Sequence, residues 1–198
     1  MSRLTEITVP DDIVQKARCG DDGAQAHIYS AMSPAVFGLI RRIVSNRALA
    51  EDLFQDTMMI VFERLGAFRG EAPLGAWVRQ VAVTRCLMYL RSPWHRSLLW
   101  LDADDSPVPP PIDTASRPDA QACASADVEK LLAMLPAITR SVVWLHDVEG
   151  YTHGEIARLL GRTTSFSKSQ LARAHTRMRE LLDPASESLP CTPVSTNC

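Results

Sequence analysis

Hydrophobic residues recur along most of this chain at the three- and four-residue spacing of amphipathic helices. In the N-terminal half the pattern predicts helices over Asp11–Cys19 and Ala26–Ser33, with Pro34 restarting or kinking the second one. The pattern is clearest over Ala48–Leu65, and a helix over Leu74–Arg91 follows a loop that contains Gly and Pro. On this last helix we expect one apolar stripe, formed by Trp77, Val81 and Met88. The alternation typical of strands is missing from this pattern, which therefore indicates a small helical bundle.

The C-terminal part carries sharper signals for helix ends. Pro136 interrupts a first helix, which has an i, i+3, i+4, i+7 pattern from Val128 onward, and Gly150 can close a second. Thr152-His-Gly-Glu155 is a capping box that opens a third, brief helix, which Gly161 ends. A fourth, longer helix keeps four apolar residues on one face: Leu171, Ala174, Met178 and Leu181. A short helix, a Gly-containing turn and a longer amphipathic helix are typical of a helix-turn-helix.

A proline-rich acidic segment separates these two helical parts. Residues 101–125 contain five prolines, five aspartates and a single arginine, and almost no large apolar side chain that could build a core. We therefore expect an all-α protein made of two small helical domains, with a helix-turn-helix as the second. The expected divisions are a first domain over 11–100, a flexible acidic linker over 101–126, a second domain over 127–183 and a disordered tail over 184–198.

The apolar runs and the cysteines of the sequence indicate the cellular compartment of the protein. No apolar run approaches the ~20 residues that a membrane-spanning helix needs. The first residues have no hydrophobic stretch typical of a secretion signal, and the five scattered cysteines form no C-x-x-C pair. We therefore expect a cytoplasmic protein without membrane insertion.

Charge is distributed unevenly along the chain, although the net charge is only −2. Residues 155–179 hold six basic side chains against one glutamate, which favours a polyanion-binding element. On the last predicted helix and the turn before it, small, hydroxyl, amide and basic residues occupy the face away from the apolar stripe, a composition that suits a DNA groove. The alternative is a solvated helix with scattered positive charge. The candidate DNA contacts are Arg162, Ser165, Lys168, Ser169, Gln170, Ala172, Arg173 and Arg177.

Two further surfaces carry candidate chemistry. On the Ala48–Leu65 helix one anionic face surrounds a central methionine, through Asp52, Gln55, Asp56, Met59 and Glu63. That face is either a docking surface for a basic protein or a plain solvated face. From Phe68 to Arg96 arginines alternate with aromatic residues, which suits single-stranded nucleic acid. The alternative there makes Trp77 a core residue and the arginines solubilising.

Motifs for catalysis are missing from the sequence. The five histidines lack ligand spacing, and no phosphate-binding or nucleophile motif occurs. We therefore expect no catalytic residue, no bound metal, no cofactor and no enzymatic activity.

Three stretches in this order resemble a known family. They are AEDLFQDTMMIVFERL (Ala50–Leu65), FRGEAPLGAWVRQVAV (Phe68–Val83) and EIARLLGRTTSFSKSQLARAHTRMRELL (Glu155–Leu182). Placed around a linker, they resemble a bacterial RNA polymerase sigma factor of the extracytoplasmic-function (ECF) group. The likeness covers residues 13–96 and 128–182 and implies sigma region two in the first domain and region four in the second.

The resemblance implies roles for the candidate residues. The anionic face would bind polymerase core at the β′ subunit, and the acidic linker would follow the RNA-exit path. The helix-turn-helix residues Arg162 to Arg177 named above would read the minus-thirty-five duplex. The separated minus-ten strand, with a flipped base held by the loop at 68–73, would be bound by Phe68, Arg69, Trp77, Arg79, Thr84, Arg85 and Arg91.

The implied partners are RNA polymerase core, through its β′ and β subunits, promoter DNA and an anti-sigma factor. Thr84 and Met88 stand where family members often have Asn and Asp, and Ser165–Leu171 replaces the usual GTVKSRL, so altered promoter preference is expected. The alternative function is a helix-turn-helix repressor or activator that acts without polymerase core binding and needs a dimer and a palindromic operator. A third is a helical adaptor with no nucleic-acid role.

Overall fold

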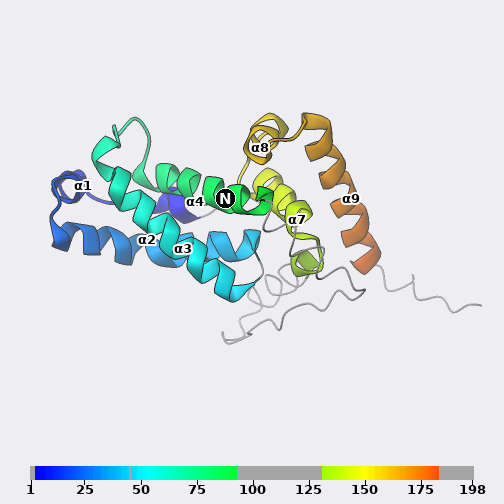
Figure 1. Cartoon of the computed structure of the whole chain (residues 1–198), viewed down its shortest axis with the longest axis horizontal. Coiled ribbons are helices and arrows are strands. Elements are labelled where there is room, and N and C mark those ends of the chain that lie inside the picture. Colours follow the sequence, from blue (N-terminus) through cyan, green and yellow to red (C-terminus); the bar gives the residue numbers. More distant parts are fainter. Residues whose placement is uncertain (1–2, 45, 93–130, 183–198) are drawn as a thin grey trace, which may run out of the picture.

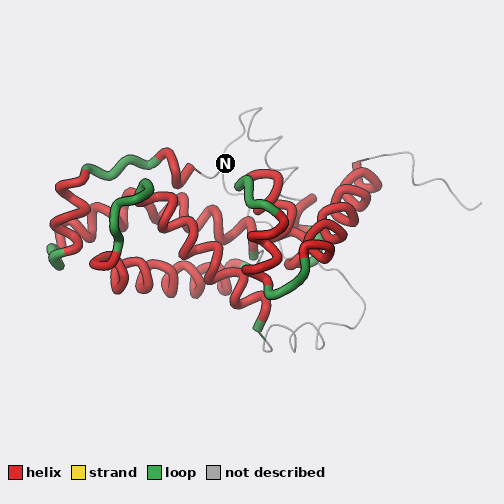
Figure 2. Tube along the Cα trace, turned by 90° about the horizontal axis from the view of Figure 1, so that it is seen from above, coloured by secondary structure: helices red, strands yellow, loops and turns green. Residues whose placement is uncertain are grey.

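Every regular element in residues 3–44, 46–92 and 131–182, the part of the chain that the computed structural model describes, is helical (Figure 1). Figure 2 shows the same residues from a second direction, with short loops between the helices. The elements before residue 93 are η1 (Arg3–Glu6), α1 (Asp11–Arg18), α2 (Asp22–Ile43), α3 (Arg47–Arg64), η2 (Leu65–Ala67) and α4 (Leu74–Arg91). Those after residue 130 are α7 (Ala137–Val143), the π-helical turn η3 (Trp144–Val148), α8 (His153–Leu160) and α9 (Thr164–Leu182).

Helix starts follow from side-chain caps and proline. The side chain of Asp21 accepts a hydrogen bond from the Ala24 amide at 2.7 Å and starts α2. Asn46 does the same for α3 through the Leu49 amide at 3.0 Å. Pro73 stands directly before α4. Because the first turn of a helix leaves its amides unpaired, capping oxygens at these positions fix where the helix begins.

The sequence predicted a restart or a kink at Pro34, and the restart does not occur. Helix α2 runs from Asp22 to Ile43 with Pro34 inside it, and it begins four residues before the expected start at Ala26. Pro34 is exposed, so the carbonyl that loses its partner can bond to water. Met32 and Val36 on either side are fully buried, and this packing holds the helix together through the proline.

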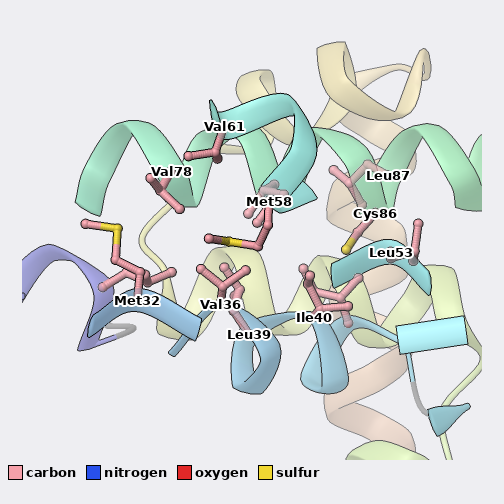
Figure 3. Close-up of a cluster of buried hydrophobic side chains, with 14 of the residues drawn as sticks. Met32, Val36, Leu39, Ile40, Leu53, Met58, Val61, Val78, Cys86 and Leu87 are labelled. Carbon is pink, nitrogen blue, oxygen red and sulfur yellow. The ribbon is translucent and has the colours of Figure 1, made fainter. Parts of the chain in front are cut away.

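Helices α2, α3 and α4 enclose the main core, and their side chains meet between the three helices in Figure 3. The stripe predicted for α4 is wrong: Met88 is 47% exposed, and Trp77 and Val81 are only half-buried. Buried residues instead occupy most of the circumference of α4, namely Leu74, Val78, Ala82, Val83, Cys86, Leu87 and Leu90. A helix covered on two sides shows no single apolar stripe, which is why its periodicity was misleading.

The predicted helix-turn-helix is formed by α8 and α9. Thr152 Oγ1 accepts from the Glu155 amide at 3.2 Å, and the Glu155 carboxylate accepts from the Thr152 amide at 2.8 Å, so the capping box is confirmed. Gly161 ends α8 with φ +62°, a left-handed conformation that favours glycine. Helix α7 packs against α9, with Leu132, Leu135, Val143 and Ala174 in a second small core.

The two helical parts touch one another. Helix α8 lies against α4, and α7 lies against α2 and α4 (Figure 1). Five buried residues of the second part belong to the same hydrophobic cluster as the α2–α4 core: Val142, Leu145, Tyr151, Ile156 and Leu160. The expected linker over 101–126, the tail over 184–198 and the helix start at Val128 lie outside the described residues.

Candidate polymerase and nucleic-acid interfaces

The anionic face of α3 is exposed, as its spacing predicts. Asp52, Gln55 and Glu63 are exposed, and Asp56 is half-buried. Met59 stands between them with 61% of its surface accessible, although a large apolar side chain gains most by burial. An apolar centre with a carboxylate rim has the make-up of a protein-docking surface.

Asp56 joins this face to α4. Its Oδ2 atom accepts a hydrogen bond from the Arg85 guanidinium, 29 residues further along the chain. The Nε atom of Arg85 is buried and makes no hydrogen bond with any described residue. One ion pair therefore connects a residue expected to bind polymerase with a residue expected to bind DNA.

A hollow lies beside the loop that precedes α4. It has a volume of about 470 Å³, and its walls come from two sides: loop residues 68–74 and the N-terminal residues between Thr5 and Arg18. The Phe68 and Trp77 rings pack at 5.4 Å with an interplanar angle of 42°, next to the exposed Arg69. These three expected minus-ten residues are brought together at one place.

The N-terminal wall of this hollow was missed by the sequence analysis. Residues Arg3–Glu6 form η1, which packs on α4. Gly75 makes this possible, since a Cβ atom there would stand 1.7 Å from the Leu4 carbonyl oxygen. The available signal was a glycine in the first turn of a strongly apolar helix, where alanine would otherwise be preferred.

The remaining expected minus-ten residues lie elsewhere on α4. Thr84 lies one turn after Gln80, whose amide donates to its hydroxyl at 3.4 Å. Arg79 reaches across to the second part of the chain, with its Nη1 atom 3.3 Å from the Glu149 carboxylate. Arg91 is exposed near Gly161, at the far end of α4.

Helix α9 presents its polar face to solvent. Ser165, Lys168, Ser169, Ala172, Arg173 and Arg177 are all exposed, together with Arg162 in the turn. The Arg162 guanidinium lies 5.6 Å from the centre of the Phe166 ring. Gln170 is half-buried, and its Oε1 atom accepts from Thr139 Oγ1 at 2.7 Å, so the fold already uses its carbonyl.

The sequence analysis also did not predict a hydrogen-bond network that connects α9 to α8 and η3. Ser167 is fully buried and lies 3.0 Å from His153 Nδ1, which ties α9 to the start of α8. Asp147 contacts His146 and His175, each at 2.8 Å, and so connects η3 to the middle of α9. Although burial alone would raise it, these hydrogen bonds and the nearby imidazoles lower the pKa of Asp147.

Among the described residues, three or more potential ligands do not gather anywhere in a way that could hold a metal ion. In the same part of the chain, every helix is too short or too polar to cross a membrane.

Comparison with known proteins places both parts of the chain. The model of "Sigma-70 region 2" matches residues 28–96, and that of "Sigma-70, region 4" matches residues 125–178. The ECF RNA polymerase sigma factor SigM of Mycobacterium tuberculosis is 32% identical over 135 residues, which cover 67% of this chain and 64% of that protein. The chain belongs to the ECF sigma-factor family.

Other family members align with this sigma factor over more of its length. The ECF RNA polymerase sigma-E factor of Haemophilus influenzae is 23% identical over 91% of this chain and 99% of its own. The sigma factor RpoE, solved in complex with the anti-sigma factor NepR from Bartonella quintana, is 27% identical and matches with a TM-score of 0.49, covering 79% of this chain and 95% of that one. This sigma factor spans under two thirds of the length of the M. tuberculosis relative.

Within the matched regions, each expected surface has a distinct position. The region-two match contains α3, the loop at 68–73 and α4, and the region-four match contains α7, α8 and most of α9. The expected polymerase-binding face and the expected duplex-reading face are therefore both exposed, whereas Arg79 is held between the two regions.

Proposed function

We propose that this sigma factor binds RNA polymerase core in the cytoplasm and directs it to promoters by reading the minus-thirty-five duplex and the melted minus-ten strand. Its role is binding and positioning, with no bond-making chemistry of its own. The observation that carries the proposal is the presence, in one chain, of an exposed acidic face in region two and an exposed basic helix-turn-helix face in region four.

Polymerase core binding is assigned to the acidic face of α3. Met59 supplies an apolar centre that is desolvated on docking, and carboxylates around it select a basic partner. The expected contact residues remain Asp52, Gln55, Asp56, Met59 and Glu63, with the β′ subunit as the main partner and the β subunit as a second.

Minus-ten recognition is assigned to the loop at 68–73 and to α4. The hollow beside the loop is large enough for a nucleobase, and the Phe68–Trp77 pair offers a surface on which a base can stack. Arg69 is exposed, with its Nη1 atom 3.8 Å from the Glu71 carboxylate, and it can turn toward a phosphate. Flipping a base costs a few kcal/mol, which stacking and arginine–phosphate contacts must offset.

Minus-thirty-five recognition is assigned to α9. Its exposed face combines Ser169 and Ala172, which allow close approach to a groove, with Lys168 and Arg173, which can contact phosphates or guanine edges. Within the described residues the fold engages the carbonyl oxygen of Gln170, and its amide group is the donor that we assign to a base contact. The acidic α3 face has no role in a simple repressor, so the sigma function is favoured over that alternative.

An anti-sigma factor is expected as a further partner, because members of the ECF family are commonly held inactive by one.

The test is binding of the purified protein to bacterial RNA polymerase core. Asp52→Lys with Glu63→Lys reverses two exposed charges on the acidic face and leaves the Asp56–Arg85 pair intact. We expect this variant to lose at least tenfold in affinity for core. Asp12→Lys, an equally exposed change on α1, should bind as the unmodified protein does. An intact, folded protein that fails to bind core would overturn the proposal.

A further inference from the structure

Three of the five histidines of the chain meet in region four, and each comes from a different helical element. The rings of His146 in η3 and His153 in α8 are stacked, with their centres 4.3 Å apart and an interplanar angle of 20°. His175 of α9 joins them through Asp147, whose carboxylate oxygens lie 2.8 Å from ring nitrogens of His146 and His175. We call these four residues the histidine cluster. Imidazole ordinarily changes its charge between pH 5 and 8, so the cluster can respond to protons near neutral pH.

The histidine cluster holds α9 at two separate points. Near the start of the helix, the buried hydroxyl of Ser167 lies 3.0 Å from His153 Nδ1, where a neutral imidazole can accept a hydrogen bond. In the middle of the helix, His175 Nε2 lies 2.8 Å from the Asp147 carboxylate. The first point adjoins Lys168, which belongs to the face assigned to the minus-thirty-five duplex. The contact between His153 and Ser167 therefore fixes the end of α9 that carries reading residues.

The surroundings of His153 disfavour its charged form. Burial lowers the pKa of this imidazole below the ordinary value of 6.5, and the neighbouring His146 and Lys168 lower it further, whereas Asp147 acts in the opposite direction. His153 is also the first residue of α8, and the positive end of the helix dipole opposes a cation at that position. A proton on His153 would therefore set a cation against a stacked imidazole and a lysine.

Other charged side chains on the elements around the cluster have different partners. They are Arg140 of α7, which interacts with Arg41, Glu149 at the end of η3, which faces Arg79 of α4, and Glu155 of α8, which interacts with Thr152 and Arg158. Among the described residues, the charges that act on His153 are thus those of His146, Asp147 and Lys168.

Protons should act differently on the two points that hold α9. When the start of α9 moves away from α8, His153 loses these neighbours and its pKa returns toward 6.5, so the released state binds a proton more readily. The contact is therefore most stable above pH 6.5 and weakens as the pH falls toward the lower pKa of the docked state. At the second point, a protonated His175 would face the Asp147 carboxylate, so this contact persists over the same range.

We propose that the histidine cluster is a proton-sensitive lock on the recognition helix. Proton uptake by the stacked pair of His146 and His153 releases Ser167 and weakens duplex reading by the start of α9, while Asp147 keeps the middle of the helix in place. This inference rests on the proposed role of α9 in reading the minus-thirty-five duplex.

The lock itself is tested without DNA on the full chain. Titration of the histidine rings by nuclear magnetic resonance gives the midpoint of His153. Hydrogen exchange at pH 7.5 and 5.5, corrected for the intrinsic effect of pH, gives the protection of α9. Acid should reduce protection over residues 167–171 and leave protection around His175 unchanged.

Two variants separate the lock from a purely structural role of these residues. His146→Gln removes one stacked ring and leaves the His153–Ser167 contact in place, so it should raise the midpoint of His153 and reduce the acid-induced loss of protection. His153→Gln retains an oxygen that can accept from Ser167 but cannot titrate, and it should also reduce that loss. His27→Gln, at an exposed position of α2, should behave as the unmodified protein does.

Duplex binding then tests the consequence for DNA. The probe is a mixed-sequence 20-base-pair duplex, bound by the full chain at pH 7.5 and 5.5. The affinity of the unmodified protein relative to that of His146→Gln should fall by about threefold between these two conditions, which corresponds to about half a pKa unit. An unchanged His153 midpoint in His146→Gln, an equal loss of protection along all of α9, or an unchanged affinity ratio would overturn the lock.

The same measurements separate this inference from the function on which it rests. If the unmodified protein did not bind the duplex at either pH and did not bind promoter DNA together with polymerase core, the proposed DNA-reading role of α9 would be refuted. The ring titration and the exchange pattern would still show whether protons release the start of α9.

Discussion

Arg85 of α4 donates a hydrogen bond to Asp56 of α3, and this pair joins the face assigned to polymerase with the helix assigned to DNA. Both side chains are partly exposed, so solvent weakens the attraction. The Nε atom of Arg85 is buried and has no hydrogen-bond partner among the described residues, so loss of Asp56 leaves this guanidinium with less compensation.

We expect Asp56→Asn to lower the free energy of unfolding by about 0.5–1 kcal/mol. Asp52→Asn, on the same face but more exposed, should change it by less than about 0.5 kcal/mol. Urea unfolding followed by circular dichroism measures both. Equal effects of the two variants would mean that the Asp56–Arg85 pair contributes nothing to stability.

Asp147 makes the stability of region four depend on pH, and the direction of its pKa shift fixes the sign of that dependence. The pKa of its carboxyl is below the ordinary value of 3.8, so the ionised form is favoured by folding. This contribution is fully present above pH 3.8 and is lost as the pH falls through the lower folded-state pKa. The stability difference between the unmodified protein and Asp147→Asn should therefore be larger above pH 3.8 than below it, and should shrink as the pH falls further. A difference that grows in acid would contradict this.

The two described cysteines should differ sharply in reactivity. Burial raises the pKa of the Cys86 thiol to about 12, and its surface is fully covered in the core. Cys19 is exposed at the end of α1. Since the thiolate is the reactive form, iodoacetamide at pH 8 should modify Cys19 in the folded protein and Cys86 only after denaturation. Mass spectrometry of the peptides would reveal early labelling of Cys86 if this were wrong.

Arg173 should contribute a sequence-independent contact to duplex DNA. In the complex with polymerase core, Arg173→Ala should weaken promoter binding and reduce the slope of log affinity against log salt by about one unit. Arg64→Ala removes an exposed cation at the end of α3, outside both DNA-reading surfaces, and should leave the slope unchanged. A similar slope for both variants would show that Arg173 does not contact a phosphate of the duplex.

Local signals predicted much of this fold. The Thr152–Glu155 capping box and Gly161 act within a few residues, so their effect can be read directly from sequence. The bounds of α4 were also predicted correctly, since Pro73 marks its start. The restart that was one of two possibilities predicted at Pro34 does not occur, because the burial of Met32 and Val36 outweighs the local preference of proline.

Some residues of the candidate surfaces could be predicted from the sequence and others could not. The exposed faces of α3 and α9 follow from helical periodicity, which fixes which residues share a side. The roles of Glu149 and Ser167 could not be predicted, because each depends on a partner from another helix. Arg79 was assigned to DNA from its residue type, and its pairing with Glu149 appears only when residues 70 positions apart are placed together.

The close approach of Leu4 to Gly75 makes the residue allowed at position 75 depend on the position of the N-terminal backbone. A chain without η1 could accept any small residue at position 75, whereas here even a methyl group would collide with a backbone carbonyl that cannot rotate away. Any substitution of Gly75 should therefore destabilise the fold unless the first residues of the chain also change. The N-terminal turn and the first turn of α4 should be inherited together, as a single unit of variation.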